Sequence, residues 1–223
     1  MKYKFSFKQF IVPNFWKRLA FMLPAVLFMG FFVSILLEIN WGTDPASFMN
    51  FNIAHTIKFS LGTTEVIVYG VMLVIVFFTG ANRIGFGTLA NMILIGYTVD
   101  LCRWIWGKCG FHDYIMTCSL APKIGIFVVA LLLFVVVAAI YMNAQMGVAP
   151  YDALPSIISE ALPKVPYFVI RIIYDFLAMG IGIFVSVFTQ DGIQGSLIGA
   201  SVMSILIGPA VSLVAKPLSK LLK

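Results

Sequence analysis

The chain alternates long apolar stretches with short polar ones. Six stretches are about 20 residues long and nearly free of charge, which is the length that a helix needs to cross the hydrocarbon core of a bilayer. These are Arg18–Ile39, Leu61–Gly80, Gly87–Trp106, Ile124–Ala144, Tyr167–Phe188 and Gly195–Ala215. Tryptophans flank the first stretch and end the third, as expected for aromatic anchors at headgroup depth. The pattern predicts an all-α fold, a polytopic membrane helix bundle of about six transmembrane helices.

Composition agrees with a single membrane domain over residues 1–223. Apolar residues make up 61% of the chain and charged residues 11%, against about 25% charged residues in a soluble domain. We therefore expect the lipid bilayer to be the main partner. The net charge of +6 does not require nucleic acid, because lysines at helix ends facing an anionic leaflet account for it.

Lysines and arginines predict the orientation. With a cytoplasmic N-terminus, ten of them fall in inside segments and four in outside segments, which favours both termini inside. The inside set is Lys2, Lys4, Lys8, Lys17, Arg18, Arg83, Lys164, Lys216, Lys220 and Lys223, and the outside set is Lys58, Arg103, Lys108 and Lys123. The basic start before Leu19 could also mark a signal peptide, but the apolar run to Leu37 is too long for one, so we expect a retained first span.

A Gly-x-x-Pro element occurs twice, as Gly42 to Pro45 after the first span and as Gly147 to Pro150 after the fourth. Each is followed by a short segment of mixed polarity, Pro45–Ile57 and Pro150–Leu162. A proline suits the first position of a helix, where its missing N–H costs nothing. The segments are too short to span, so we expect either re-entrant half-helices or amphipathic helices lying on the surface.

A glycine-led span follows later in each half, with Gly87 and Gly96 in one and Gly199 and Gly208 in the other. The order of motifs predicts a repeat of three spans plus three, over residues 15–106 and 123–215. Because three is odd, the second half must enter the membrane in the opposite sense. Such an inverted-topology repeat is typical of secondary transporters, whose substrate site lies between the halves near the midplane.

Charged residues at membrane depth are costly and mark candidate sites. Arg171 and Asp175 lie four residues apart in the fifth span, so they share one helix face. One hypothesis is a carboxylate that responds to protons or ligand and is held by the arginine. The alternative is an ion pair that only fixes helix packing.

Five further residues are candidates for substrate binding. Tyr151 and Asp152 follow the second Gly-x-x-Pro element, Asp44 lies in the first, and Glu65 opens the second span. These side chains either line a cavity or are ordinary interfacial groups. Asn91 in the third span either faces a cavity or bonds to a neighbouring helix. Asp100 and Arg103, three residues apart, are expected to form a structural pair at the outer edge.

Enzyme chemistry finds no support. The sequence has no phosphate loop, dinucleotide fingerprint or nucleophile elbow, and His55 and His112 lie in no catalytic motif. We expect no cofactor and no metal centre. Cys102, Cys109 and Cys118 do not match common zinc spacings, which leaves a Cys109–Cys118 disulfide and three free thiols as alternatives.

The chain resembles the YczE/YyaS/YitT-type family of bacterial membrane proteins. The resemblance rests on the two Gly-x-x-Pro elements and on the glycine-led third span that ends in Gly96 to Asp100. It implies a cytoplasmic-membrane protein of five or six spans for which transport is presumed. This sequence departs from a doubled pattern because Asp44 and Asp100 have no acidic counterparts in the second half.

Three functions are consistent with these patterns. The first is a secondary transporter of a small polar or anionic solute, with Asp175 as its titratable switch. The second is the substrate-binding membrane subunit of an ATP-driven vitamin-type importer. The third is a non-transporting accessory or regulatory membrane protein, and a homo-oligomer is a further option.

Overall fold

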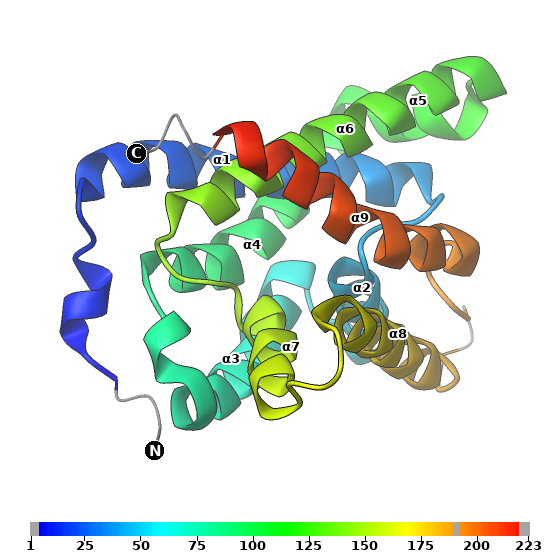
Figure 1. Cartoon of the computed structure of the whole chain (residues 1–223). Coiled ribbons are helices and arrows are strands. Elements are labelled where there is room, and N and C mark those ends of the chain that lie inside the picture. Colours follow the sequence, from blue (N-terminus) through cyan, green and yellow to red (C-terminus); the bar gives the residue numbers. More distant parts are fainter. Residues whose placement is uncertain (1–4, 190–191, 219–223) are drawn as a thin grey trace.

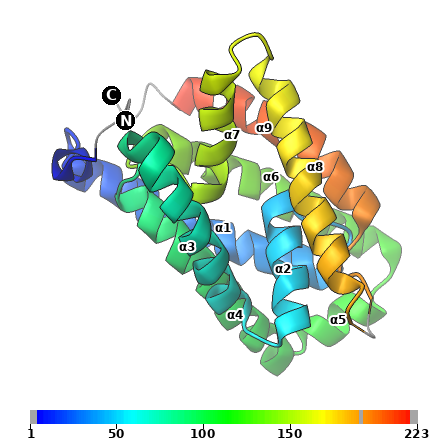
Figure 2. The same cartoon turned by 90° about the horizontal axis from the view of Figure 1, so that it is seen from below.

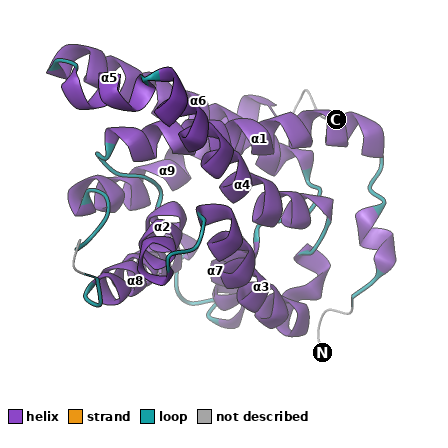
Figure 3. Ribbon diagram, turned by 180° about the vertical axis from the view of Figure 1, so that it is seen from behind, coloured by secondary structure: helices purple, strands orange, loops and turns teal. Residues whose placement is uncertain are grey.

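The computed structural model describes residues 5–189 and 192–218, and every regular element in these ranges is a helix (Figure 3). Nine α-helices are described: α1 (Phe15–Ile39), α2 (Pro45–Ile57), α3 (Leu61–Gly80), α4 (Phe86–Cys109), α5 (Phe111–Thr117), α6 (Leu120–Ala144), α7 (Pro150–Ala161), α8 (Tyr167–Ser186) and α9 (Leu197–Leu218). Short 3-10 helices cover Phe7–Phe10 and Ala81–Arg83. Four lysines used to predict the orientation, Lys2, Lys4, Lys220 and Lys223, lie outside the described residues.

Five of the described helices are long and apolar enough to cross a membrane: α1, α3, α6, α8 and α9. They indicate a multi-pass membrane protein, and their bounds lie within a few residues of the predicted spans. The predicted span Gly87–Trp106 coincides with α4, which is not among the five. Asn91, Asp100 and Arg103 lower the hydropathy of α4, which therefore differs from the other long helices in composition and not in length.

The helices form two layers (Figure 1). One layer contains α1, α6 and α9, and the other contains α2, α3, α7 and α8, with α4 between them. Helix α1 packs against both α4 and α6, and α6 packs against α9. In the other layer α2 packs against α8, and α3 packs against α7 and α4. Seen from below, α2 lies beside α8, inside the bundle (Figure 2).

The first helix break lies between α1 and α2. Asn40 ends α1 in the left-handed conformation with φ 62°, and Gly42 follows with φ 124°. Pro45 then opens α2, where Asp44 Oδ1 accepts a hydrogen bond from the Ser47 N–H at 3.0 Å. This N-cap pairs one of the amides that a helix start leaves unpaired. The observed bounds of α2 are the predicted ones.

The second break, between α6 and α7, shows the same order of backbone conformations as the first. Gln145 ends α6 with φ 51°, Gly147 has φ 106°, and Pro150 opens α7. Helix α7 ends at Ala161, one residue before the predicted end. The segment between α6 and α7 bonds to the chain before α4, where the Val148 N–H donates to the Arg83 carbonyl at 3.0 Å.

Each break is in close contact with the other half of the chain. A Cβ on Gly42 would lie 2.5 Å from the Gly199 carbonyl carbon, and a Cβ on Gly199 would lie 1.7 Å from the Trp41 oxygen. A Cβ on Gly147 would lie 2.6 Å from the Gly85 nitrogen. Only glycine allows both the positive φ and the backbone contact at positions 42 and 147.

The remaining predicted structural glycines differ among themselves. Gly87 lies against the Gly147 carbonyl, and a Cβ on Gly96 would meet Gly62 Cα at 2.6 Å. A Cβ on Gly208 would have no atom of another described residue within 4 Å outside its own helix turn. Gly208 therefore differs from Gly96 in packing, because a side chain at this position of α9 would meet no described neighbour.

Polar contacts fix the end of the bundle that carries α5. Glu38 on α1 is buried and accepts from Arg103 Nε at 2.8 Å, and its second oxygen lies 2.6 Å from His112 Nδ1. Asp100 accepts from the backbone N–H groups of Leu61 and Gly62, at 3.0 and 2.8 Å. The predicted Asp100–Arg103 pair is therefore wrong. All three cysteines are free thiols.

Candidate functional site

Arg171 on α8 joins two helices through two carboxylates. Its Nε donates to Asp175 Oδ2 at 3.1 Å, and its Nη1 donates to Asp152 Oδ1 on α7 at 2.6 Å. The Asp175 side chain is only 4% exposed, whereas Asp152 is 39% exposed. The i, i+4 pair expected in this span is thus part of a larger ionic contact that holds α7 against α8.

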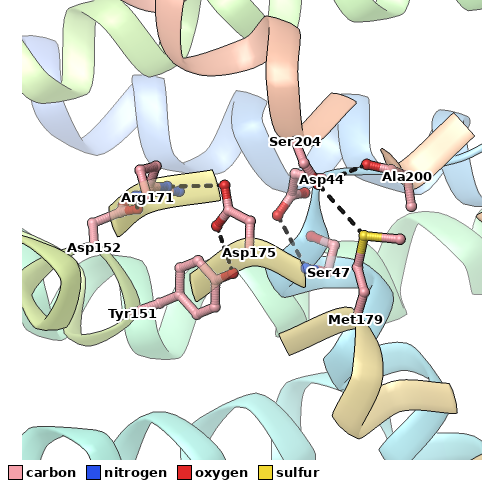
Figure 4. A network of polar contacts seen from close by, with 9 residues as sticks. All are labelled: Asp44, Ser47, Tyr151, Asp152, Arg171, Asp175, Met179, Ala200 and Ser204. Carbon is pink, nitrogen blue, oxygen red and sulfur yellow. Dashed lines mark hydrogen bonds and ion pairs between the residues drawn. The ribbon is translucent and has the colours of Figure 1, made fainter. Parts of the chain in front are cut away.

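Tyr151 is the second hydrogen-bond partner of the Asp175 carboxylate. Its hydroxyl donates to Asp175 Oδ1 at 2.8 Å, so both carboxylate oxygens are bonded. Figure 4 shows Tyr151 and Arg171 turned toward this carboxylate. Burial raises the pKa of Tyr151 well above its usual value, which keeps the hydroxyl protonated as a donor. Its ring lies 4.8 Å from that of Tyr174 and 6.4 Å from that of Tyr69, centroid to centroid.

Asp44, at the first helix break, lies near the ionic cluster formed by Tyr151, Asp152, Arg171 and Asp175. Asp152 and Arg171 both act on its charge. Its Oδ1 caps α2, but its Oδ2 is buried and has no hydrogen-bond partner among the described residues. Burial raises the pKa of Asp44, and the hydrogen bond from Ser47 opposes that rise.

Glu65 extends the cluster into the seam between α3 and α4. The residue is 5% exposed, and it interacts with the Tyr69 hydroxyl and the Gly96 backbone. Its Oε2 occupies the space that a Cβ on Gly96 would need, at 2.4 Å. Gly96, selected from the sequence as a structural glycine, therefore makes room for this carboxylate. Glu65 is buried and close enough to Asp44 for the two charges to repel, so it is not an ordinary exposed interfacial group.

Asn91 is the one sequence candidate that stays apart from these contacts. It is 4% exposed on α4 and makes no side-chain hydrogen bond within the described chain. Sequence reasoning missed two buried polar residues, Tyr69, which interacts with Glu65, and Asn50, whose side chain has no hydrogen-bond partner in the described chain. Tyr69 stands one helical turn after Glu65, and Asn50 interrupts the apolar face of α2 between Ala46 and Ile53; both spacings were visible in the sequence.

The cluster carries more negative than positive groups. Asp152 and Asp175 bind the Arg171 guanidinium. Asp44 lies close enough to this guanidinium for the two charges to attract, and Glu65 lies close enough to Asp44 for the two carboxylates to repel. Such an excess in a buried place is costly unless protons or another cation balance it. Binding of a proton or of another cation would reduce this excess of negative charge. Within residues 5–189 and 192–218, no group of three His, Cys, Asp or Glu side chains is placed to hold a metal ion.

Comparison with known proteins identifies the family of the chain. The family model of DUF6198, a family of unknown function, matches residues 16–216, which is most of the chain and includes all the residues of the cluster. No curated protein and no solved structure matches the chain. The resemblance to the YczE/YyaS/YitT-type family remains a prediction. The chain belongs to the DUF6198 family.

Proposed function

We propose that the protein is a secondary transporter that moves a small polar solute across the bacterial cytoplasmic membrane. The observation that carries this proposal is the position of the ionic cluster. Arg171 and Asp175 lie within a spanning helix and contact the start of α7, just after one helix break. Arg171 also lies close enough to Asp44, at the other break, for the two charges to attract. Charged groups at helix breaks inside a membrane protein are typical of solute and ion sites.

We also propose that the chain is an inverted repeat of three spans plus three, and the pattern of helix contacts supports this. Exchanging α1 with α6, α2 with α7, α3 with α8 and α4 with α9 turns the main helix contacts into one another. The contact of α1 with α4 becomes that of α6 with α9, and the contact of α2 with α8 becomes that of α7 with α3. The exchange also turns the contact of Gly42 with Gly199, at the start of α9, into that of Gly147 with Gly85, at the start of α4. In this arrangement α2 and α7 are the broken, re-entrant helices of the two halves.

Six crossings with both termini cytoplasmic fit the contacts between helix ends. Arg18 near the start of α1 donates to the Ala144 carbonyl at the end of α6, at 2.8 Å. Asn143, also at the end of α6, donates to the Ala215 carbonyl near the end of α9, at 2.8 Å. These three ends therefore share one side, as six crossings require. Helix α4 starts on that side and reaches Glu38 at the other through Arg103, which is the path of a sixth span.

The solute is better described as polar than as anionic. Among the described residues, Arg171 is the one cation that contacts the cluster, and two carboxylates already bind it. An anionic group would meet Asp44 and Glu65 without a second guanidinium to offset them. A neutral or zwitterionic solute with hydrogen-bond donors fits this set of acceptors, and protonation of Asp175 would switch the site between states.

The test is the substitution Asp175→Asn. The purified protein is screened for thermal stabilisation by amino acids, small carboxylates and vitamins at two pH values, and the best ligand is then followed into proteoliposomes. We expect Asp175→Asn to abolish the pH dependence of uptake and to lower its rate. Asp113→Asn, in the exposed part of α5, is the matched control. Uptake by Asp175→Asn with an unchanged pH profile would rule out the proposed switch.

A further inference from the structure

We propose that Asp44, Asn50 and Glu65 line a binding site for a sodium ion where α2 meets the seam between α3 and α4. The proposal rests on the proposed transport function only in naming the ion that would drive it, since ion binding itself needs no solute. Three independent features carry it: an unpaired buried amide, its direction, and two carboxylates without a cation in contact among the described residues.

Asn50 has a buried side-chain amide with no hydrogen-bond partner in the described chain. The residue is 1% exposed, yet neither its Oδ1 nor its Nδ2 has a hydrogen-bond partner in the described chain. An unpaired buried polar group costs about 1–3 kcal/mol, and buried amides in native proteins are nearly always bonded. Asn52, two residues later, has partners for both atoms: it donates to Phe48 and Gln194 and accepts from Ser186 and Gln194.

Asn50 lies on the face of α2 whose apolar residues pack with α3 and α4. Ala46 and Ile53, which flank Asn50 on this face, pack with Tyr69 of α3 and Met92 of α4. Ala54, on the adjacent flank, packs with the cluster formed by α1, α4 and α6. Asn50 therefore faces the line along which α3 and α4 meet. Glu65 lies in that seam, against the backbones of Gly62 and Gly96.

Asp44 and Glu65, which lie close enough for their charges to repel, have no basic partner in contact within the described ranges. Asp44 Oδ2 is unpaired there, and Glu65 interacts with neutral groups, the Tyr69 hydroxyl and the Gly96 backbone. Arg171 is bonded to Asp152 and Asp175 instead. Thr64, next to Glu65, is fully buried with an Oγ1 that has no partner in the described chain, which adds a neutral oxygen on the same turn of α3.

This set of atoms suits a hard monovalent cation. Carboxylate, amide and hydroxyl oxygens are the ligands that hard cations take, and transporters bind sodium at broken helices through such oxygens. A proton would neutralise one carboxylate but leave the Asn50 oxygen and Asp44 Oδ2 unpaired. A divalent or transition metal is less suited, because no group of three His, Cys, Asp or Glu side chains is placed for it in the described ranges.

Sodium and protons would compete for the same carboxylates. Besides Asp44 and Glu65, the titratable and charged groups that face the site are Tyr69 on α3, Asp100 on α4, Tyr151 and Asp152 on α7, and Arg171 on α8. Because binding needs the ionised carboxylates, more sodium should be required as the pH falls.

The test measures the melting temperature of the full chain in detergent by tryptophan fluorescence. Sodium chloride replaces choline chloride at constant ionic strength, with potassium chloride as a second series, at mildly alkaline and mildly acidic pH. We expect a saturable rise with sodium, a smaller one with potassium, and a midpoint that moves to higher sodium at acidic pH. A ligand that binds only the folded state raises stability in this way.

Variants separate a site from a packing effect. Glu65→Gln and Asn50→Ala should weaken the sodium response at least about tenfold, as the loss of a partner at a metal site does. Asn52→Ala should lower the melting temperature in every salt and keep the response. If sodium and choline give the same melting temperature at both pH values, or if Asn50→Ala responds like the wild type, the sodium site is wrong. Stability that varies with pH alone would show that protons titrate the cluster without sodium.

Sodium binding and solute transport can fail separately. Sodium stabilisation without uptake of any solute would leave the ion site in place and remove the transport proposal. Solute uptake that Asp175→Asn alters, with no response to sodium, would keep the transport proposal and remove the ion site. Direct binding of radioactive sodium to the Glu65→Gln variant, read beside wild type, distinguishes a lost site from lost folding.

Discussion

The break before α2 and the break before α7 follow the same path with different side chains. A left-handed residue, a glycine of positive φ and a proline at the first helical position occur in both. At the helix start, however, the first break has Asp44 as its cap, and the second has Ala149, which has no side-chain cap. The first break has a carboxylate oxygen, Asp44 Oδ2, without a hydrogen-bond partner in the described chain, and the second lies next to Arg171 through Asp152.

The two short helices are also held differently. Helix α2 is buried on several faces and is tied to α8 and the segment before α9 through Asn52, Ser186 and Gln194. Helix α7 is amphipathic, has Pro155 in its interior and has exposed residues in its last turn. The difference teaches that the repeated glycines and prolines set the path of the chain, while the chemistry of the site is divided unequally between the halves.

The strongest test of the comparison is to add a methyl group at each break. Gly42→Ala and Gly147→Ala should each lower the free energy of unfolding by about 2–5 kcal/mol, because a non-glycine residue is strained at positive φ and the new Cβ overlaps backbone atoms. The contacts are those of Gly199 with position 42 and of Gly85 with position 147. Unfolding in detergent, followed by circular dichroism, measures the loss.

Gly125→Ala is the control for these two variants, because a Cβ added at this position would meet no neighbouring atom within 4 Å among the described residues. It lies within α6, where alanine favours the helix over glycine by roughly 0.5–1 kcal/mol. Equal losses at positions 42 and 147 would support equivalent breaks. A loss at only one of them would show that the shared backbone is not needed in both halves.

The second test concerns Asp44, the acidic cap at the first break, and measures how stability depends on pH. Burial raises the pKa of Asp44, so the folded state binds its proton more tightly than the unfolded state does. This contribution to stability is fully present below the unfolded pKa of about 3.9 and is lost as the pH rises through the folded pKa. In choline buffer, Asp44→Asn should therefore flatten the fall in melting temperature with rising pH.

The informative quantity is the difference between the wild type and Asp44→Asn at each pH, because other groups titrate in both proteins. Asp113→Asn is the matched control, since Asp113 is exposed on α5. A difference that stays constant across the acidic and neutral range would contradict a raised pKa and leave only the loss of the cap to Ser47, worth about 1 kcal/mol.

Most of the fold could be predicted because its signals are local. Apolar length located the long helices, and the proline at position 45 with its preceding Asp44 located α2 to the residue. Helix α5 was not predicted, because seven residues between Gly110 and Cys118 carry too few apolar positions to show a period. Helix α4 is ambiguous for a physical reason: its polar residues are paired or buried by other helices instead of facing lipid.

Less of the site could be predicted. Contacts between residues close in the sequence were visible, and contacts between distant residues were not. The Arg171–Asp175 contact has i, i+4 spacing and was visible, as were Tyr151 and Asp152 beside a proline. The partners of Glu38 lie 65 and 74 residues away, and no local pattern indicates them. Asn50 shows as an interruption of an apolar face, but only the folded neighbours reveal that it has no partner in the described chain.

The smallest expected effect concerns the ion pair that joins the end of α7 to Arg83. Arg83 forms an ion pair and a hydrogen bond with Glu160, whose side chain is 48% exposed. Exposed pairs contribute about 0–1 kcal/mol, so Glu160→Gln should lower the melting temperature only slightly, and less in high salt. If α7 is the loosely held member of the two short helices, hydrogen exchange in residues 150–161 should rise in this variant while exchange in α2 stays unchanged. A loss comparable to that of Gly147→Ala would instead mean that α7 depends on this pair, and the two short helices would then be held with similar strength by different means.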